Sequence, residues 1–180
     1  IFLNSLHGYN QTLYYYLIKK HIDEMVPIIY TPLVGYGVEQ FSAEFRSTRG
    51  LYISYDNQDI IETILNNRTN SEIDLIVVSD GQGVLGIGDQ GLGGLVISVA
   101  KLSIYSIFGA IDPNKTFHLI LDVGTDNEKL LSNPFYLGIR KNRISQEKYD
   151  QFISKFVQAV KKVLPKAFLH WEDFGRSNAE

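Results

Sequence analysis

One lysine stands inside an otherwise apolar stretch of the chain. Lys101 is the only charged residue between Leu95 and Tyr105. We predict a helix from about Gly94 to Phe108, and a helix that is hydrophobic on nearly all sides is normally buried. A lysine in such a helix extends its amine to water, pairs with an acid, or carries a lowered pKa that suits it to general-base chemistry. The residues alone leave these three alternatives open.

Two adjacent carboxylates near the C-terminal end suggest a metal site. Glu172 and Asp173 follow a strand that we predict from Ala167 to Trp171. Adjacent side chains at a strand end can both turn into a cleft once the chain leaves the pleat. Carboxylates without a neighbouring cysteine or histidine cluster suit a hard cation, Mg²⁺ or Mn²⁺. His170 is interpreted as a packed histidine or as support for a ligand, not as a ligand itself.

A phenol that could act as an acid lies between two prolines. Tyr30 stands in the segment from Pro27 to Pro32. We expect Pro27 to end a helix that Asn10 caps, and Ile28 to begin a short extended piece. A rigid extended segment is a good mount for a proton donor. The alternative is that Tyr30, one of 11 tyrosines, only packs.

A glycine-rich loop follows a predicted strand. Seven of the 15 glycines lie between Gly81 and Gly94, and the pattern G-x-G-x-x-G occurs twice. The dinucleotide-binding fingerprint has this context, but its glycines form one tight turn and its helix begins inside the motif. Here the loop continues for several residues and carries Asp89. We therefore favour a loop that lets backbone approach a ligand or turns tightly, with a Rossmann site as the alternative.

These residues must be positioned by alternating strands and helices. That order predicts an α/β domain with a largely parallel sheet flanked by helices. Ligands bind at the carboxyl ends of parallel strands, so Asp80, Asp122 and the pair Glu172–Asp173 predict a polyvalent acidic site. The alternative is that each aspartate only caps a turn. The expected strands are 50–54, 73–79, 117–122 and 167–171, and the expected helices are 10–27, 34–45, 59–66, 94–108 and 145–164.

Length and composition exclude several classes of protein. The chain has 180 residues, 44% hydrophobic and 21% charged, enough for one folded domain and unlike a disordered segment. A net charge of −3 provides no basic face for nucleic acid. We expect no apolar run of the roughly 18 residues that span a membrane. The absence of cysteine excludes disulfides and zinc–thiolate sites and fits a cytoplasmic location.

Eight segments together resemble the N-terminal catalytic domain of the malic enzymes and their relatives, the malolactic enzymes. They run in the family's order and cover nearly the whole chain. The segments are Asn10–Tyr15, Pro27–Gly35, Arg49–Ser54, Val77–Gly81, Leu85–Gly91, Lys101–Leu102, Leu121–Glu128 and Trp171–Gly175.

The resemblance implies oxidative decarboxylation of malate to pyruvate and CO₂ with reduction of NAD or NADP. It implies that Tyr30 is the proton donor, that Lys101 is the proton acceptor, and that Glu172 and Asp173 are two of three ligands of Mg²⁺ or Mn²⁺. The glycine loop then forms the wall and floor of the catalytic cleft. The family assembles as dimers or tetramers, so a homo-oligomer is expected, with neither nucleic acid nor membrane as partner.

The resemblance also implies that essential parts lie beyond residues 1–180. The third metal ligand, an aspartate, and the NAD-binding domain are expected in a C-terminal part absent from this chain. The sequence begins with the apolar residues Ile1 to Leu3, and we expect it to be a piece of a longer protein. The 180 residues alone are therefore expected to be inactive.

Two positions depart from the family pattern. Gly83 stands where many members have an arginine that contacts malate and cofactor, and Tyr9 where many animal members have an arginine of an allosteric anion site. Regulation through that anion site is therefore not expected. Gly83 and the segment Leu169–Ser177 resemble malolactic enzymes, whereas Tyr30–Pro32 and Arg49–Gly50 resemble malic enzymes. The alternatives are a malolactic enzyme, which releases lactate and retains NAD, and a non-catalytic nucleotide-binding or interaction domain.

Overall fold

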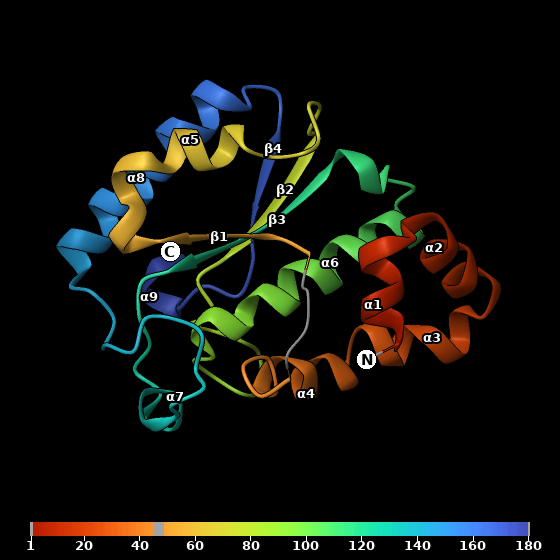
Figure 1. Cartoon of the computed structure of the whole chain (residues 1–180), viewed down its shortest axis with the longest axis horizontal. Coiled ribbons are helices and arrows are strands. Elements are labelled where there is room, and N and C mark those ends of the chain that lie inside the picture. The colour runs from red at the N-terminus through yellow and green to blue at the C-terminus, as the bar shows by residue number, and fades with distance from the viewer. Residues whose placement is uncertain (1, 45–48, 180) are drawn as a thin grey trace.

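A computed structural model describes residues 2–44 and 49–179. Within these residues the centre is a four-stranded parallel sheet with the order β1-β3-β2-β4 (Figure 1). The strands are β1 (Leu51–Ser54), β2 (Leu75–Ser79), β3 (Thr116–Asp122) and β4 (Phe168–Trp171). The central strands β2 and β3 are almost completely buried, as their continuous apolar runs predict. The predicted α/β class with a parallel sheet is confirmed.

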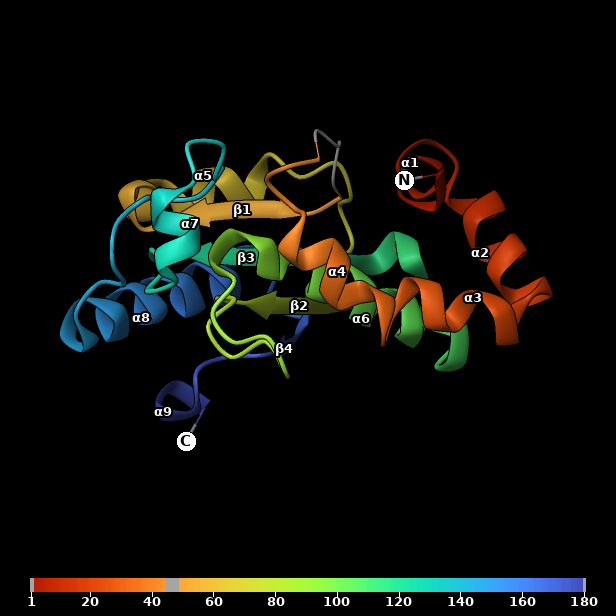
Figure 2. The same cartoon turned by 90° about the horizontal axis from the view of Figure 1, so that it is seen from below.

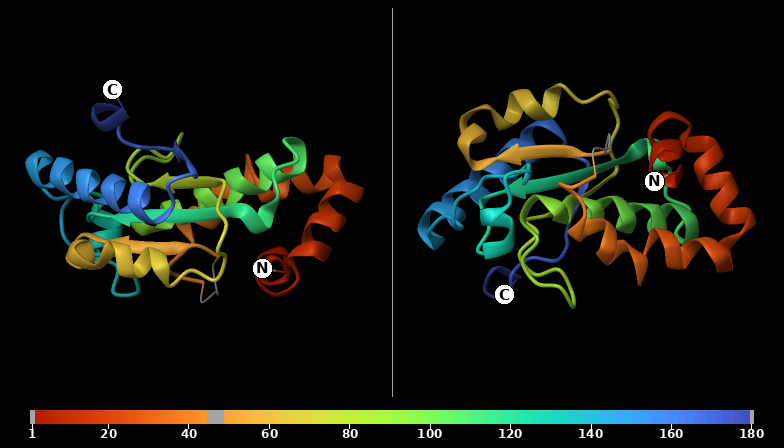
Figure 3. Two further views of the ribbon diagram at one scale, coloured as in Figure 1. Left: turned by 90° about the horizontal axis from the view of Figure 1, so that it is seen from above. Right: turned by 60° about the horizontal axis from the view of Figure 1, so that its bottom comes forward.

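Helices cover both faces of the sheet. The helices α5 (Ile61–Asn66) and α8 (Gln146–Val163) lie on one face and α6 (Leu95–Phe108) on the other (Figure 3). Successive residues of a strand point to opposite faces, so Val78 joins the core under α5 and α8, whereas Val77 packs with α6. The helices predicted at 94–108 and 145–164 are confirmed.

Four helices form a group beyond α6. They are α1 (Phe2–Tyr9), α2 (Gln11–Lys20), α3 (Ile22–Ile29) and α4 (Leu33–Glu39), and they lie to one side of the sheet (Figure 2). The helices α1, α2 and α3 share a small core, and the group packs on α6 through α2 and α4. It brings the C-terminal end of α3 to the side of α6.

The predicted helix from Asn10 to Pro27 is divided into α2 and α3. Asn10 caps α2 as expected, because its side-chain oxygen accepts a hydrogen bond from the Leu13 N–H at 3.0 Å. The prediction that Pro27 ends the helix is wrong, since α3 runs through it. The Tyr30 N–H donates to the Val26 carbonyl at 3.0 Å and closes the last turn. The segment before Tyr30 is therefore helical and not extended.

Two other helix boundaries need correction. The helix predicted at 59–66 begins instead as a 3₁₀ helix, Tyr55–Ile60, and continues as α5. Its cap is Ser54, whose hydroxyl accepts a hydrogen bond from the Asp56 N–H at 3.1 Å. The helix predicted at 34–45 ends with α4 at Glu39, and position 45 lies outside the described residues. The structure adds short elements that the sequence did not predict: α1, α7 (Glu128–Ser132) and α9 (Arg176–Ala179).

The expectation that no apolar run is long enough to span a membrane is wrong for the segment Gly91–Phe108. These 18 residues are long and apolar enough to cross a membrane by length and composition. In the structure most of them are buried, because α6 packs between the sheet and the helices α2 and α4. A helix buried on nearly all sides is expected to be this hydrophobic.

His7 and His118 lie buried where the N-terminal helices meet the sheet. Their side chains are 2% and 5% exposed, and their ring centroids are 6.3 Å apart. The ring of His7 stacks on Tyr14 at 4.1 Å. Burial lowers the pKa of both histidines to about 3; the charge of His7 lowers that of His118 further, and the charge of Arg49 acts on both in the same direction. Both rings are therefore neutral in the folded protein at neutral pH.

We expect mild acid to destabilise the protein through these two rings. Their folded pKa lies below the ordinary value of 6.5, so the unfolded chain takes up protons first. Stability then falls as the pH drops below 6.5 and stops falling near pH 3. At about pH 5 each histidine lowers the free energy of unfolding by about 2 kcal/mol.

Thermal unfolding of the full-length protein between neutral pH and about pH 5 measures this loss. His118→Gln should lose less stability on acidification than the wild type, whatever its stability at neutral pH. His21→Gln is the matched control, since His21 makes no side-chain hydrogen bond within the described residues. If His118→Gln and the wild type lose the same stability on acidification, the prediction is contradicted.

Candidate active site

Residues from three distant parts of the chain meet at Lys101. Lys101 lies in α6, Tyr30 directly follows α3, and Glu172 directly follows β4. The Lys101 Nζ donates to the Tyr30 Oη at 2.8 Å and to the Glu172 Oε1 at 2.8 Å. The structure thus brings the two predicted catalytic residues into contact with one predicted metal ligand.

Lys101 is held as a cation in this arrangement. Of the three alternatives for a lysine in an apolar helix, the structure shows pairing with an acid. Burial lowers the pKa of Lys101, but the hydrogen bonds and charges of Glu172 and Tyr30 outweigh burial and hold the pKa well above its usual range. The alternative of a lowered pKa is wrong for this arrangement. Lys101 must release a proton before it can accept one from a substrate.

Asp173 stands beside Glu172 in an unusual backbone conformation. Its φ is +53°, a left-handed value that is uncommon outside glycine and best tolerated by Asn and Asp. The Gly83 N–H donates to the Asp173 carbonyl at 3.0 Å and supports this conformation. Burial, and then the negative charge of Glu172, raise the pKa of the Asp173 carboxyl. Within the described residues no salt bridge reaches this carboxylate.

The two carboxylates fit a divalent cation as an incomplete site. Their oxygens are the hard donors that Mg²⁺ and Mn²⁺ prefer, and a cation would compensate the charge that raises the Asp173 pKa. Within residues 2–44 and 49–179 no group of three acidic, histidine or cysteine side chains could hold a metal ion. A metal at Glu172 and Asp173 therefore requires a further ligand from outside the described residues.

His170 contacts the other oxygen of the Glu172 carboxylate. The His170 Nε2 lies 2.7 Å from the Glu172 Oε2. The imidazole ring also meets Tyr105 of α6 edge to face, with centroids 5.6 Å apart. The interpretation of His170 as support for a ligand agrees with this contact.

Asp80 and Asp122 do not join the site. The Asp80 carboxylate accepts from the Tyr149 hydroxyl at 2.8 Å. The Asp122 carboxylate accepts from the backbone N–H groups of Gly124 and Ile139 at 3.0 and 2.7 Å. The prediction of a polyvalent acidic site at three strand ends is wrong, because two of the acids are used to hold loops. The alternative of turn capping applies to them.

Arg143 is an important residue that the sequence analysis missed. Its side chain is 7% exposed and donates to both oxygens of Asp89, at 2.9 and 2.8 Å. It also donates to the backbone carbonyl of Asp80 at 2.9 Å. Since Asp80 and Asp89 flank the exposed part of the glycine loop, Arg143 ties the base of that loop together. Arg143 lies in an irregular segment, and neither periodicity nor a motif marks it in the sequence.

The glycine loop is an excursion and not a single tight turn. Val84 and Gly88 form an antiparallel bridge within it, and a 3₁₀ turn, Gly91–Gly94, separates the loop from α6. A dinucleotide fingerprint would begin the helix inside the motif. The loop instead lies beside the segment that leads from β4 to α9 (Figure 2), where the Gly83 N–H donates to the Asp173 carbonyl.

Gly83 lies directly against the backbone of Phe174. A Cβ atom at position 83 would clash with the Phe174 carbonyl oxygen and lie 2.9 Å from its carbonyl carbon. Position 83 therefore accepts only glycine in this backbone arrangement. The arginine that many family members carry here could not be introduced without moving the chain next to Asp173.

We expect Gly83→Ala to destabilise the protein by about 1–3 kcal/mol, as overpacking does. Gly8→Ala is the matched control, because a Cβ at Gly8 in α1 meets no atom within 4 Å and alanine favours a helix. Thermal unfolding of both variants and the wild type makes the comparison. If Gly83→Ala unfolds at the wild-type temperature, the close approach to Phe174 does not constrain this position.

Comparisons with known proteins agree with this geometry. Residues 7–180 match the family model of the malic enzyme N-terminal domain. The NAD-dependent malic enzymes of Shewanella pealeana, Idiomarina loihiensis and Colwellia psychrerythraea are 50%, 49% and 48% identical to the chain over 179 residues. Each alignment covers 99% of this chain but 32% of the relative, so the chain spans about a third of these relatives' length. The chain belongs to the malic enzyme family and forms its N-terminal domain.

Proposed function

We propose that the full-length protein containing this chain is an NAD-dependent malic enzyme that converts malate to pyruvate and CO₂. The observation that carries the proposal is the cluster at Lys101, whose Nζ contacts Tyr30 and Glu172 at 2.8 Å each. These two contacts join the proposed base, the proposed acid and a carboxylate proposed to bind metal. Relatives about half identical to the chain bear the name NAD-dependent malic enzyme, which supports the same activity.

Lys101 and Tyr30 supply the proton transfers of the proposed reaction. Once deprotonated, the Lys101 Nζ accepts the proton of the malate hydroxyl while hydride leaves C2 for NAD⁺. After the bond to the departing CO₂ breaks, the Tyr30 Oη donates a proton to C3 of the resulting enolate and pyruvate results. The direct hydrogen bond between Lys101 and Tyr30 lets the proton on Lys101 return to the phenol.

Glu172 and Asp173 would hold Mg²⁺ or Mn²⁺ together with a ligand outside the described residues. When bound, such an ion polarises the substrate oxygen and stabilises the negative charge that develops during decarboxylation. We further propose that the nicotinamide cofactor is bound mainly by a domain beyond these 180 residues. The chain's share of its relatives' length, 32%, leaves room for such a domain.

The relatives' names favour malic over malolactic activity for the whole protein. Gly83, which resembles the malolactic pattern, has a structural reason that is independent of the product, namely its contact with Phe174. We therefore propose that NADH and pyruvate are released, and not lactate.

An assay of the full-length protein with malate, Mn²⁺ and NAD⁺ tests this proposal. NADH absorbance should rise with an equal amount of pyruvate, and chelation of the metal should stop both. NADP⁺ in place of NAD⁺ should react more slowly. Lactate without net NADH would instead establish a malolactic enzyme, and folded protein that consumes no malate would refute both activities.

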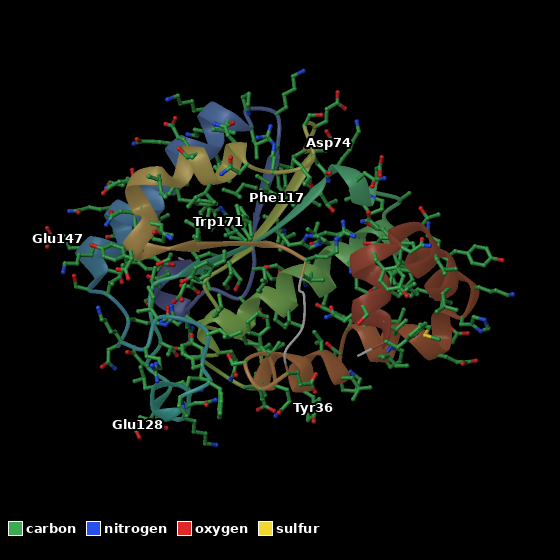
Figure 4. The ribbon with its side chains drawn as sticks, in the orientation of Figure 1. Tyr36, Asp74, Phe117, Glu128, Glu147 and Trp171 are labelled. Atoms are coloured by element: carbon green, nitrogen blue, oxygen red, sulfur yellow. The ribbon has the colours of Figure 1, made fainter. Side chains whose placement is uncertain are left out.

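We also propose that the protein is a homodimer or homotetramer. Large apolar side chains are exposed on the N-terminal helices, including Phe2, Tyr9, Tyr16 and Tyr36. The Tyr36 side chain lies on the outer side of α4, away from the sheet (Figure 4). Several exposed aromatics on one group of helices are typical of an interface. Light scattering of the full-length protein during size exclusion measures the number of subunits.

A further inference from the structure

His170 and Glu172 lie on the same side of the chain at the end of β4. Residues two apart in an extended chain point in the same direction, and β4 ends at Trp171, between them. The His170 Nε2 is 2.7 Å from the Glu172 Oε2. We propose that His170 is a positioning residue that fixes the Glu172 carboxylate for metal binding. This inference rests on the proposed function.

Both oxygens of the Glu172 carboxylate have a defined partner. The Oε1 contacts the Lys101 Nζ at 2.8 Å, and the Oε2 contacts His170. The Glu172 side chain is 13% exposed, so little water competes for either oxygen. Two partners on opposite oxygens set the plane of the carboxylate, whereas Lys101 alone would leave it free to rotate.

The contact assigns the role of donor to His170. An ionised carboxylate only accepts hydrogen bonds, so the Nε2 must carry the hydrogen. A nitrogen that carries a hydrogen has no lone pair for a metal ion. The Nε2 of His170 therefore orients the Glu172 carboxylate and does not itself bind the metal ion.

The imidazole ring is held in turn by α6. Tyr105 meets it edge to face at 5.6 Å, with 82° between the ring planes. Tyr105 lies four residues after Lys101, which places both side chains on one face of the helix. The same helix face thus fixes Glu172 from both sides, directly through Lys101 and indirectly through the ring of His170.

Removing such a partner from a metal ligand typically costs about 10–100-fold in metal affinity or activity. His170→Gln should keep most of the affinity, because a glutamine amide can donate from nearly the same place. His170→Asn offers the same amide one methylene shorter and should not reach Glu172. Glutamine and asparagine therefore form a matched pair that differs in reach and not in chemistry.

The test measures Mn²⁺ affinity of the full-length protein by electron paramagnetic resonance, without malate or NAD⁺. We expect His170→Leu and His170→Asn to weaken Mn²⁺ binding by about 10–100-fold and to lower kcat more than they change KM for malate. His170→Gln should stay within about threefold of the wild type. The control His21→Leu, whose side chain makes no hydrogen bond within the described residues, should bind Mn²⁺ as the wild type does.

Wild-type Mn²⁺ affinity in His170→Asn or His170→Leu would overturn the inference. So would equal losses in His170→Gln and His170→Asn, because reach would then not matter. If His170→Leu fails to fold, the Mn²⁺ affinities of His170→Gln and His170→Asn still test the inference. Mn²⁺ binding needs no turnover, so the inference can hold in a protein that does not consume malate. Conversely, the wild type could consume malate while the His170 variants bind Mn²⁺ as tightly as the wild type does. That result would overturn this inference and leave the proposed function intact.

Discussion

Under the proposed function, replacing Lys101 by methionine in the full-length protein is expected to lower kcat/KM for malate by about 10²–10⁴-fold, the usual contribution of general acid–base catalysis. Methionine fills similar space in α6 but offers no proton acceptor and no contact to Tyr30 or Glu172. The rate of NADH formation at saturating Mn²⁺ measures the loss. Tyr30→Phe removes only a hydroxyl and should lower pyruvate formation by a similar factor, because the enolate then lacks its proposed proton donor.

The control for this experiment is Lys115→Met. Lys115 forms a surface ion pair with Glu72 at 3.2 Å, and surface pairs contribute little. Its loss should leave kcat/KM unchanged. Activity of Lys101→Met within about threefold of the wild type would remove Lys101 from the proton transfers.

The second large effect is expected for Arg143→Met. This change leaves Asp80 and Asp89 without their shared cation, and Asp80 is 1% exposed. Breaking a buried ion pair by removing one partner costs about 3–5 kcal/mol. Urea and thermal unfolding of the full-length protein should show the loss, and limited proteolysis should cut the glycine loop more readily.

A surface arginine close in sequence provides the comparison for Arg143. Arg140 is exposed, so Arg140→Met should change stability by no more than about 0.5 kcal/mol. The double variant Arg143→Met with Asp89→Asn should recover part of the loss, because one uncompensated charge is removed. Equal stability of Arg143→Met and Arg140→Met would show that the buried network contributes nothing net.

The architecture could be predicted because its signals are local. The two central strands are continuous apolar runs, and α6 and α8 show the lengths and patterns of buried and half-buried helices. The break between α2 and α3 could not be predicted from Pro27. A proline removes one hydrogen bond, and the remaining bonds of α3 kept the helix intact around it.

The candidate site was only partly visible in the sequence. Lys101 stood out because it is a single charge in an apolar helix, and its pairing with an acid was one of the alternatives. The partner Glu172 and the contact to Tyr30 depend on distant chain segments, and the family resemblance, not the spacing, assigned their roles. Arg143 left no local signal, since ion pairs between loops follow neither periodicity nor a motif.

The pairing of β2 with β4 sets the order in which the domain can be completed. Leu75 pairs with Phe168 near the far end of the chain. During synthesis one edge of the apolar strand β2 therefore stays unpaired until nearly the whole domain has left the ribosome, and such edges invite aggregation. Glu172 and Asp173 follow β4 directly, so they arrive together with the strand that covers this edge. A nascent chain that carries both carboxylates has thus already made the strand that pairs with this edge of β2.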